Sequence, residues 1–450
     1  MVSNLKTDLT TRSASSTLLS LATPMVLGVS STIVVQTIEL GFIGQLSTTH
    51  VAAITFTFPI VMILTSIALG ISIGTSSVIA RKIGSDEHSE SNRLATHSLI
   101  LVTGMISVLS IVGWLAIDPL FTAMGASAEV LPLIHSYLDI YYPGTVLFTV
   151  TMVAGNIMRA HGSANIPGAA MTIGAFINLA LDPILIFGWF GAPRMELAGA
   201  ATAMLITRIA TSAVLLYYVF GHRFAVRSMS LSGFISSARK ILHVGLPAMA
   251  TQLIGPVSGA VITRLIASHG ETAVAGFGVA TRIEALAVML FFALSGSIGP
   301  FVGQNAGAQR YDRVKEGVFA SYKFCIAWGV FAAIVLYFLG GQFASWIDDK
   351  EAVVTTAALY LALVPWSYGL WGILMMSSAS FNALGKPLPS TTMSFMRMFI
   401  LNVPMALVFN QAFGYEGVFL SICLSNTIMG LIAYVWLNKG ALHHADTSVD

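Results

Sequence analysis

Charge is what this sequence has least of. Only 9% of its 450 residues are Asp, Glu, Lys or Arg, whereas 56% are hydrophobic, and the mean hydropathy is +0.81. A soluble domain carries about 25% charged residues. The composition therefore excludes an ordinary water-soluble protein. The net charge of +2 and the scattered basic residues do not indicate a nucleic-acid-binding surface.

Cysteines and catalytic motifs are also scarce. Cys325 and Cys423 are the only two cysteines, and both fall in apolar runs, so no disulfide framework is expected. The tripeptide at 385–387, Gly-Lys-Pro, lacks the earlier Gly and the following Ser or Thr of a phosphate-binding loop. The ten His are dispersed. We therefore expect no catalytic residues, no metal site and no cofactor, and an intramembrane enzyme is the unfavoured alternative.

Long apolar runs are what the chain has instead, and runs of about 18 residues or more indicate membrane-spanning helices. Strand-type alternation is absent. We predict an all-α integral membrane protein of about twelve helices, at roughly 16–43, 52–80, 96–116, 131–158, 166–188, 197–220, 240–267, 273–301, 319–341, 354–383, 389–411 and 415–437.

The basic residues orient these helices. With the N-terminus inside, the cytoplasmic segments hold 16 of the 22 Lys and Arg, the outer segments hold three, and three lie within helices. Such asymmetry follows the positive-inside rule. It predicts a multi-pass protein of the plasma (inner) membrane, in contact with lipid, with both termini cytoplasmic.

An internal repeat divides the chain. Pro24 matches Pro247 and Gly84 matches Gly307 at one constant offset, and these residue types specify kinks and turns. We predict a six-helix lobe over 1–220, a cytoplasmic linker over 221–240 and a second lobe with a short polar tail over 241–450. Since each half has an even number of spans, the pseudo-two-fold axis should run along the membrane normal.

Two acids stand in these apolar surroundings. Glu39 precedes positions 40–80, which hold no Asp, Glu, Lys or Arg, and Asp182 lies in the fifth predicted helix. Intramembrane carboxylates are costly and commonly functional. Glu39, Asp182 and Thr202 are predicted to share one depth within roughly 3 Å, and Asn178 lies one turn from Asp182. The set could hold a proton, a sodium ion or water. Snorkelling of Glu39 and a structural hydrogen bond of Asp182 are the alternatives.

Four further residues are candidates. Pro24 lies on the helix of Glu39 and could act as a hinge or form a static kink. Glu284 and Arg282 lie in the eighth predicted helix, with Arg397 in the eleventh. They could form a structural ion pair across the second lobe or take part in a relay.

Five segments stand out by their motifs. They are residues 24–53 around Glu39-Leu40-Gly41, 70–84 ending Ala80-Arg81-Lys82-Ile83-Gly84, 178–183 (Asn-Leu-Ala-Leu-Asp-Pro), 198–202 (Ala-Gly-Ala-Ala-Thr) and 303–307 (Gly-Gln-Asn-Ala-Gly). Together and in this order, they resemble the multidrug and toxic compound extrusion (MATE) transporters. The resemblance implies a V-shaped, two-lobed exporter of cationic, amphipathic compounds, driven by inward flow of protons or sodium.

The chain departs from the family pattern in two places. Many prokaryotic members have Asp where Glu39 stands. The sodium-coupled branch has acids in helices seven and ten, where this chain has Gly255 and no acid over 352–385. The resemblance thus favours the DNA-damage-inducible branch, with coupling in the first lobe. A lipid-linked precursor flippase and a passive channel are the rivals within transport, and a monomer is expected.

Overall fold

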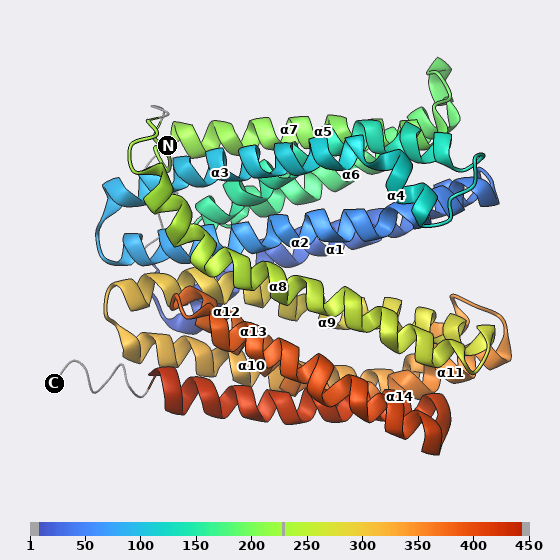
Figure 1. The fold of residues 1–450 in the computed structure, drawn as a ribbon. Helices are drawn as coiled ribbons and strands as arrows, with labels where there is room; N and C mark the ends of the chain where they lie inside the picture. Colours follow the sequence, from blue (N-terminus) through green and yellow to red (C-terminus); the bar gives the residue numbers. More distant parts are fainter. Residues whose placement is uncertain (1–8, 227–229, 443–450) are drawn as a thin grey trace. The chain divides into compact units, whose positions relative to one another are not determined.

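The computed structural model describes residues 9–226 and 230–442, and in those ranges helices are joined by turns and short loops, with no strand. The first half contains α1 (Ala14–Gly44), α2 (Thr48–Gly84), α3 (His88–Leu115), α4 (Ile117–Ala123), α5 (Leu131–Ala160), α6 (Asn165–Phe187), η1 (Trp189–Gly191) and α7 (Glu196–Gly221) (Figure 1). The second half contains α8 (Phe234–Ala267), α9 (Glu271–Gly307), α10 (Tyr311–Ser345), α11 (Glu351–Leu363), η2 (Val364–Ser367), α12 (Tyr368–Ala383), α13 (Pro387–Phe395), η3 (Met396–Asn402), α14 (Val403–Val435) and η4 (Trp436–Leu442).

Twelve long helices are present in the described part of the chain, as predicted. Within residues 9–226 and 230–442, ten helical segments are long and apolar enough to cross a membrane. One of them, Pro387–Lys439, is broken at Gly414, whose φ of 62° and ψ of −148° only glycine adopts readily. This break gives two helices, and α5, with 30 residues, is a further long helix.

The helices extend beyond the apolar runs. α3 begins at His88 rather than 96, and α10 begins at Tyr311 rather than 319. Helical backbone satisfies its own hydrogen bonds, so it continues through the charged ends where hydropathy has already fallen. The helix predicted at 354–383 is interrupted by the 3₁₀ turn η2, which contains Pro365, a residue without the N–H that a continuous helix needs.

The chain forms two compact units. The first unit comprises Thr23–Met249 of the described residues, and the second comprises Leu9–Ala22 together with residues from Ala250 onward. The divisions therefore fall inside α1, just before Pro24, and inside α8, just after Pro247. The lobe boundaries predicted at 220 and 241 stay a prediction about the two halves of the repeat.

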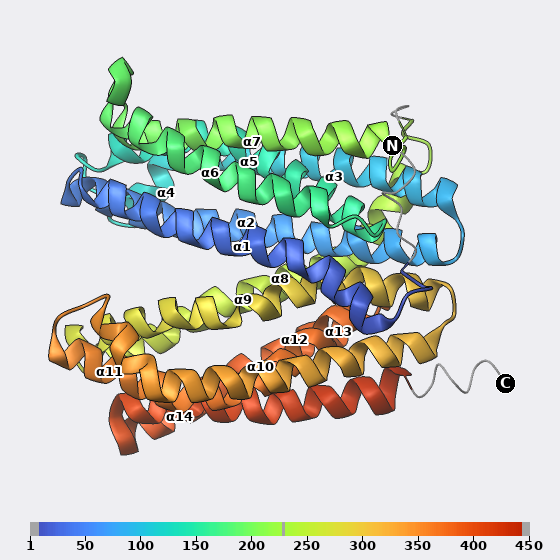
Figure 2. The ribbon, with the colours of Figure 1, turned by 180° about the vertical axis from the view of Figure 1, so that it is seen from behind.

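In the first unit, α5 packs against α2, α3 and α7, and Figures 1 and 2 show α5 and α7 running side by side. Glycines bring other helices close. Gly70 and Gly74 of α2 face the backbone of α8 around Gly245, where any side chain would collide. Gly168 of α6 faces Pro24 of α1 in the same way. Small residues at four-residue spacing allow such close approach of membrane helices.

In the second unit, α9 anchors the segment that precedes α1. Gln304 Oε1 accepts a hydrogen bond from the Leu9 backbone N–H at 3.2 Å, and Asn305 Nδ2 donates to the Leu9 carbonyl at 3.2 Å. Arg313 binds the carbonyls of Leu9 and Arg12. The 303–307 motif therefore binds the segment that leads into α1.

Candidate functional site

Asp182 is fully buried within the first unit. Its Oδ2 accepts a hydrogen bond of 2.9 Å from Asn178 Nδ2, one helical turn earlier on α6. Its other oxygen, Oδ1, is buried without a hydrogen-bond partner among the described residues. The hydrogen bond joins two residues that the sequence places one helical turn apart. One carboxylate oxygen remains available to a proton, an ion or water.

Glu39 lies close enough to Asp182 for the two carboxylates to interact electrostatically. Both residues lie five positions before the ends of their helices, Gly44 and Phe187, and Thr202 lies six positions after the start of α7 at Glu196. These positions along the helices agree with the common depth expected from the sequence, which stays a prediction. The Thr202 hydroxyl, however, donates to the Ala198 carbonyl of its own helix at 2.7 Å rather than to either acid.

Sequence reasoning missed a cation beside these acids. Arg208 of α7 interacts electrostatically with Glu39. Its guanidinium lies over the rings of Tyr141 and Phe148 of α5, 5.1 and 4.8 Å from their centroids. Tyr137, on the same face of α5, is buried within the field of both acids. Arg208 is the only charge in the sequence between 197 and 221, which was the available signal.

The second unit holds a separate polar cluster around Glu284 of α9. Tyr360 of α11 donates a hydrogen bond to Glu284 Oε2. Arg397 interacts with Glu284 electrostatically, and its Nη1 donates to Asn426 Oδ1 at 2.8 Å. Arg282 does not join them, because it is exposed and lies two residues from Glu284, on another face of α9. The arginine that the structure places near Glu284 is therefore Arg397.

Arg397 stands in an unusual stretch of backbone. Residues Met396–Asn402 form a π-helical turn between α13 and α14. Such turns are rare and occur frequently at functional sites. Because Arg397 lies in this π-helical turn, it and its neighbours are candidate functional residues.

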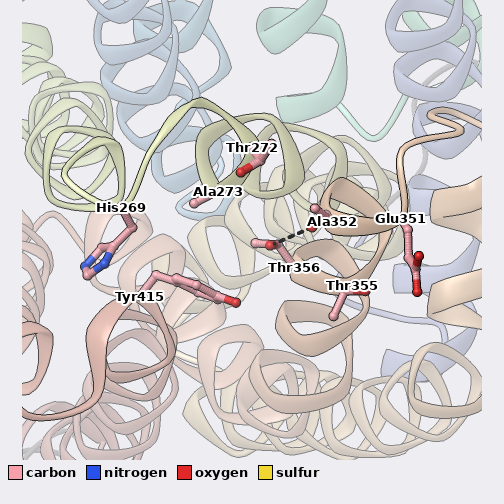
Figure 3. Close-up of a pocket in the computed structure, with 8 residues that line it drawn as sticks. All are labelled: His269, Thr272, Ala273, Glu351, Ala352, Thr355, Thr356 and Tyr415. Carbon is pink, nitrogen blue, oxygen red and sulfur yellow. Dashed lines mark hydrogen bonds between the residues drawn. The ribbon is translucent and has the colours of Figure 1, made fainter.

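A surface pocket of about 410 Å³ lies elsewhere in the second unit (Figure 3). His269 and Tyr415 lie at one end of it and Glu351 at the other. His269 Nε2 is within 2.7 Å of Asn410 Oδ1, so this ring already has a partner. No residue predicted as a site residue lines this pocket.

Pro24 lies inside α1 and packs on α6. A Cβ at Gly168 would lie 2.5 Å from the Pro24 carbonyl oxygen, and one at Gly28 would lie 2.9 Å from Met171 Cβ. The residues of α1 up to Ala22 belong to the second unit and those from Thr23 onward to the first. The proline therefore stands where α1 passes from one compact unit into the other.

Comparison with known proteins identifies the family. The family model MatE matches this chain twice, over residues 24–184 and 247–408. The chain belongs to the MATE family. The two matches begin at Pro24 and at Pro247, the prolines that the sequence already pairs, so they reproduce the internal repeat.

Relatives of this MATE protein carry different names. It is 33% identical over 419 residues to a protein of Shewanella oneidensis named FAD transporter, with 93% of each chain covered. It is 25% identical over 408 residues to the probable multidrug resistance protein YoeA of Bacillus subtilis, covering 86% of this chain and 87% of that one. The crystal structure of the Vibrio cholerae MATE transporter VcmN in the bent form matches with a TM-score of 0.91 at 28% identity, covering 96% and 98%.

Membership of this family settles the protein class. The chain is a multi-pass membrane transporter rather than an enzyme, and its two-lobed helical fold is that of MATE transporters. The expectations of the fold class and of the family are therefore confirmed. The roles of Glu39, Asp182, Asn178, Thr202 and Pro24 stay predictions.

Proposed function

We propose that this protein is a secondary exporter in which protons entering the cell bind at Glu39 and Asp182 while cargo leaves. One observation carries the proposal. Asp182 is fully buried, yet one of its carboxylate oxygens has no partner among the described residues, and a second acid lies within electrostatic range. Two acids that repel each other in an apolar lobe are stabilised by taking up a cation.

A proton suits this site better than sodium. Arg208 already supplies a fixed positive charge near Glu39. Both ions bring one positive charge, but a proton binds a single carboxylate oxygen, whereas a metal cation needs several ligands, and the described residues contain no group of three or more His, Cys, Asp or Glu that could hold one. Asn178 can keep its hydrogen bond to Asp182 in either protonation state, because only one oxygen is engaged.

The cargo has two candidate classes. Cationic, amphipathic drugs are the first, because the Bacillus subtilis relative is named a probable multidrug resistance protein and two acids attract cations. A flavin dinucleotide is the second, because the Shewanella oneidensis relative is named a FAD transporter. The arginines placed over aromatic rings favour this second class, since it combines a flat ring with phosphates.

Helix α1 is the proposed moving part. Protonation of Glu39 or Asp182 removes the electrostatic repulsion between the two carboxylates. The outer half of α1 can then repack against α6 and α7. Bending at Pro24 would accommodate this movement, because proline removes a helical hydrogen bond. The narrow contact between Pro24 and Gly168 would then change with the protonation state.

The test is transport by the full chain in proteoliposomes. Efflux of a fluorescent cationic dye such as ethidium is measured with proton and sodium gradients imposed separately. We expect the proton gradient to drive efflux, and Glu39→Gln and Asp182→Asn each to slow it by roughly 10- to 100-fold, the effect of losing one charged hydrogen-bonding group.

Asp139→Asn is the matched control. Asp139 is an exposed acid of α5 that accepts a hydrogen bond from Trp114 Nε1 at 2.8 Å and lies near His135, so it has contacts of its own. This variant should transport normally. Wild-type rates in both Glu39→Gln and Asp182→Asn would disprove the coupling role, and efflux driven by sodium alone would disprove the choice of ion.

A further inference from the structure

The first arginine cluster consists of Arg208, Tyr141 and Phe148. The guanidinium lies over both rings, and Gly144 of the same α5 face leaves room for it, because a Cβ there would lie 3.3 Å from Nη1. Stacking on aromatic faces holds an arginine without consuming its N–H donors. The cluster therefore presents a cation whose hydrogen-bonding capacity remains largely available.

The free capacity of Arg208 is visible at one atom. Nη1 is buried and has no hydrogen-bond partner in residues 9–226 and 230–442. In the same ranges no carboxylate lies within ion-pair distance of this guanidinium, although Glu39 acts on it from further away. A buried donor of a charged group without a partner is costly, so a ligand that supplied an acceptor would be stabilised.

The second arginine cluster consists of Arg397, Trp371 and Asn426. The Arg397 guanidinium lies 5.7 Å from the Trp371 ring centroid, and its Nη1 donates to Asn426. Arg397 Nε is buried without a hydrogen-bond partner among the described residues. The buried Tyr368 hydroxyl makes no hydrogen bond of good geometry there either, although Glu284 lies near it. The Arg397 Nε donor in this neighbourhood thus remains open to an acceptor.

The two clusters occupy equivalent places in the repeat. Phe148 and Trp371, the rings under the two guanidiniums, are related by the constant offset of the internal repeat, and so are Tyr137 and Tyr360, the tyrosines near the acids of each unit. The arginines themselves come from different elements, α7 and the π-helical η3. Simple duplication therefore does not explain why each unit sets a guanidinium on the same ring position.

We propose that each arginine cluster, within its own unit, can bind the anionic group of an aromatic cargo, and that the group is a phosphate or pyrophosphate. Planar guanidinium groups recognise phosphate oxygens through several N–H donors at once. The tyrosine and tryptophan rings beside them offer flat faces to a planar cargo. An inside-negative membrane potential would itself favour outward movement of such an anion. This inference rests on the proposed export function and specifies its substrate class.

A purely structural role for the arginines is a weaker explanation. A structural guanidinium inside a lobe would be expected to form a close ion pair, because desolvation of an unpaired charge is costly. Arg208 and Arg397 instead each lie in the field of one acid, Glu39 or Glu284, without an ion pair in the described residues. The acids lower the cost of keeping the guanidiniums in place and leave their donors open.

Binding of flavins to the purified full chain in nanodiscs tests the proposal. FAD, FMN and riboflavin share one ring system but carry a pyrophosphate, a phosphate and no phosphate, respectively. The variants are Arg208→Gln, Arg397→Gln and the double substitution. Arg282→Gln is the matched control, because it removes the same charge from an exposed position of α9.

We expect the wild type to bind FAD and FMN more tightly than riboflavin. The double variant should weaken FAD and FMN binding by roughly 10- to 100-fold, as loss of charge-assisted hydrogen bonds does, and should leave riboflavin binding nearly unchanged. Arg282→Gln should bind all three as the wild type does. Equal losses for riboflavin and FMN, or no preference of the wild type for FMN, would overturn the proposal.

Lysine variants cover the case in which the glutamine variants do not fold. Arg208→Lys and Arg397→Lys keep the charge but lose the planar set of donors. The preference for FMN over riboflavin should fall several-fold, and an unchanged preference would contradict the proposal. Efflux of ethidium and of the three flavins from proteoliposomes separates the two hypotheses. Gradient-driven efflux without a phosphate preference defeats this inference alone, whereas absence of all gradient-driven efflux defeats the proposed function.

Discussion

Gly168→Ala is the substitution that most directly tests movement of α1. The added Cβ would lie 2.5 Å from the Pro24 carbonyl oxygen and 2.7 Å from Pro24 Cβ. Both helices contribute backbone or ring atoms here, so no flexible side chain can turn away. Relief requires α1 and α6 to separate by several tenths of an ångström, and overpacking of this kind typically costs about 1–3 kcal/mol.

The cost applies only to conformers in which α1 and α6 are this close. If export alternates between such a conformer and one in which α1 has moved at Pro24, the substitution shifts their populations by roughly 5- to 100-fold. We expect export to slow by a similar factor, because the cycle must visit both conformers. Expression and membrane insertion should change little, since one methyl group leaves the hydropathy of α6 intact.

The assay is dye efflux from proteoliposomes, with the melting temperature of the purified protein as a second readout. Gly41→Ala is the matched control, because it makes the same change in α1 where a Cβ would meet no atom within 4 Å. Wild-type efflux in Gly168→Ala would refute the reasoning that this contact changes during transport. A slowed Gly41→Ala variant would show that helix propensity, rather than the contact, controls the rate.

Two other predictions follow from the ends of the chain. Asn305→Ala removes the donor to the Leu9 carbonyl and the Oδ1 acceptor for Arg313 Nε at 3.0 Å, so a cysteine introduced at Thr10 should react several-fold faster with a water-soluble thiol reagent; an unchanged rate would mean that this anchor is dispensable. A reporter fused after Asp450 should show cytoplasmic activity, as the basic-residue asymmetry predicts, and periplasmic activity would contradict the twelve-span orientation.

The helices could be predicted from the sequence because hydropathy and helix length respond to the same physical constraint. A segment that crosses the bilayer must be apolar and must satisfy its own backbone, and both requirements leave long uncharged runs. The ends of the helices could be predicted less well from the sequence. α3 and α10 continue through His88 and Tyr311, where charged residues remain helical outside the apolar layer. The break at Gly414 was placed correctly between two predicted helices.

Part of the candidate site was also predictable. Asn178 and Asp182 are four residues apart, so their hydrogen bond follows from helical geometry alone. The choice of partner for Glu284 did not follow. Arg282 is near in sequence but on another face, whereas Tyr360 and Arg397 reach Glu284 through tertiary packing of three elements. Residues this far apart along the chain cannot be placed in contact from the sequence alone, because their separation depends on the fold.

Helices α1 and α8 are each divided between the two compact units, and the two divisions fall at matching positions of the repeat. In α1 the division falls just before Pro24, and in α8 it falls just after Pro247, the two prolines matched by the repeat. Gln304 and Asn305 hold the start of α1 in the second unit, while Gly70 and Gly74 hold the start of α8 in the first. The second unit therefore holds the start of α1 by hydrogen bonds, and the first unit holds the start of α8 by close packing. A proline at each passage removes one helical hydrogen bond where a bend would be needed. Any change in the packing of α1 near Glu39 must then act on a helix whose first turns are fixed to the second unit. This arrangement connects the two units through the chain itself, without requiring a signal to pass through side-chain contacts.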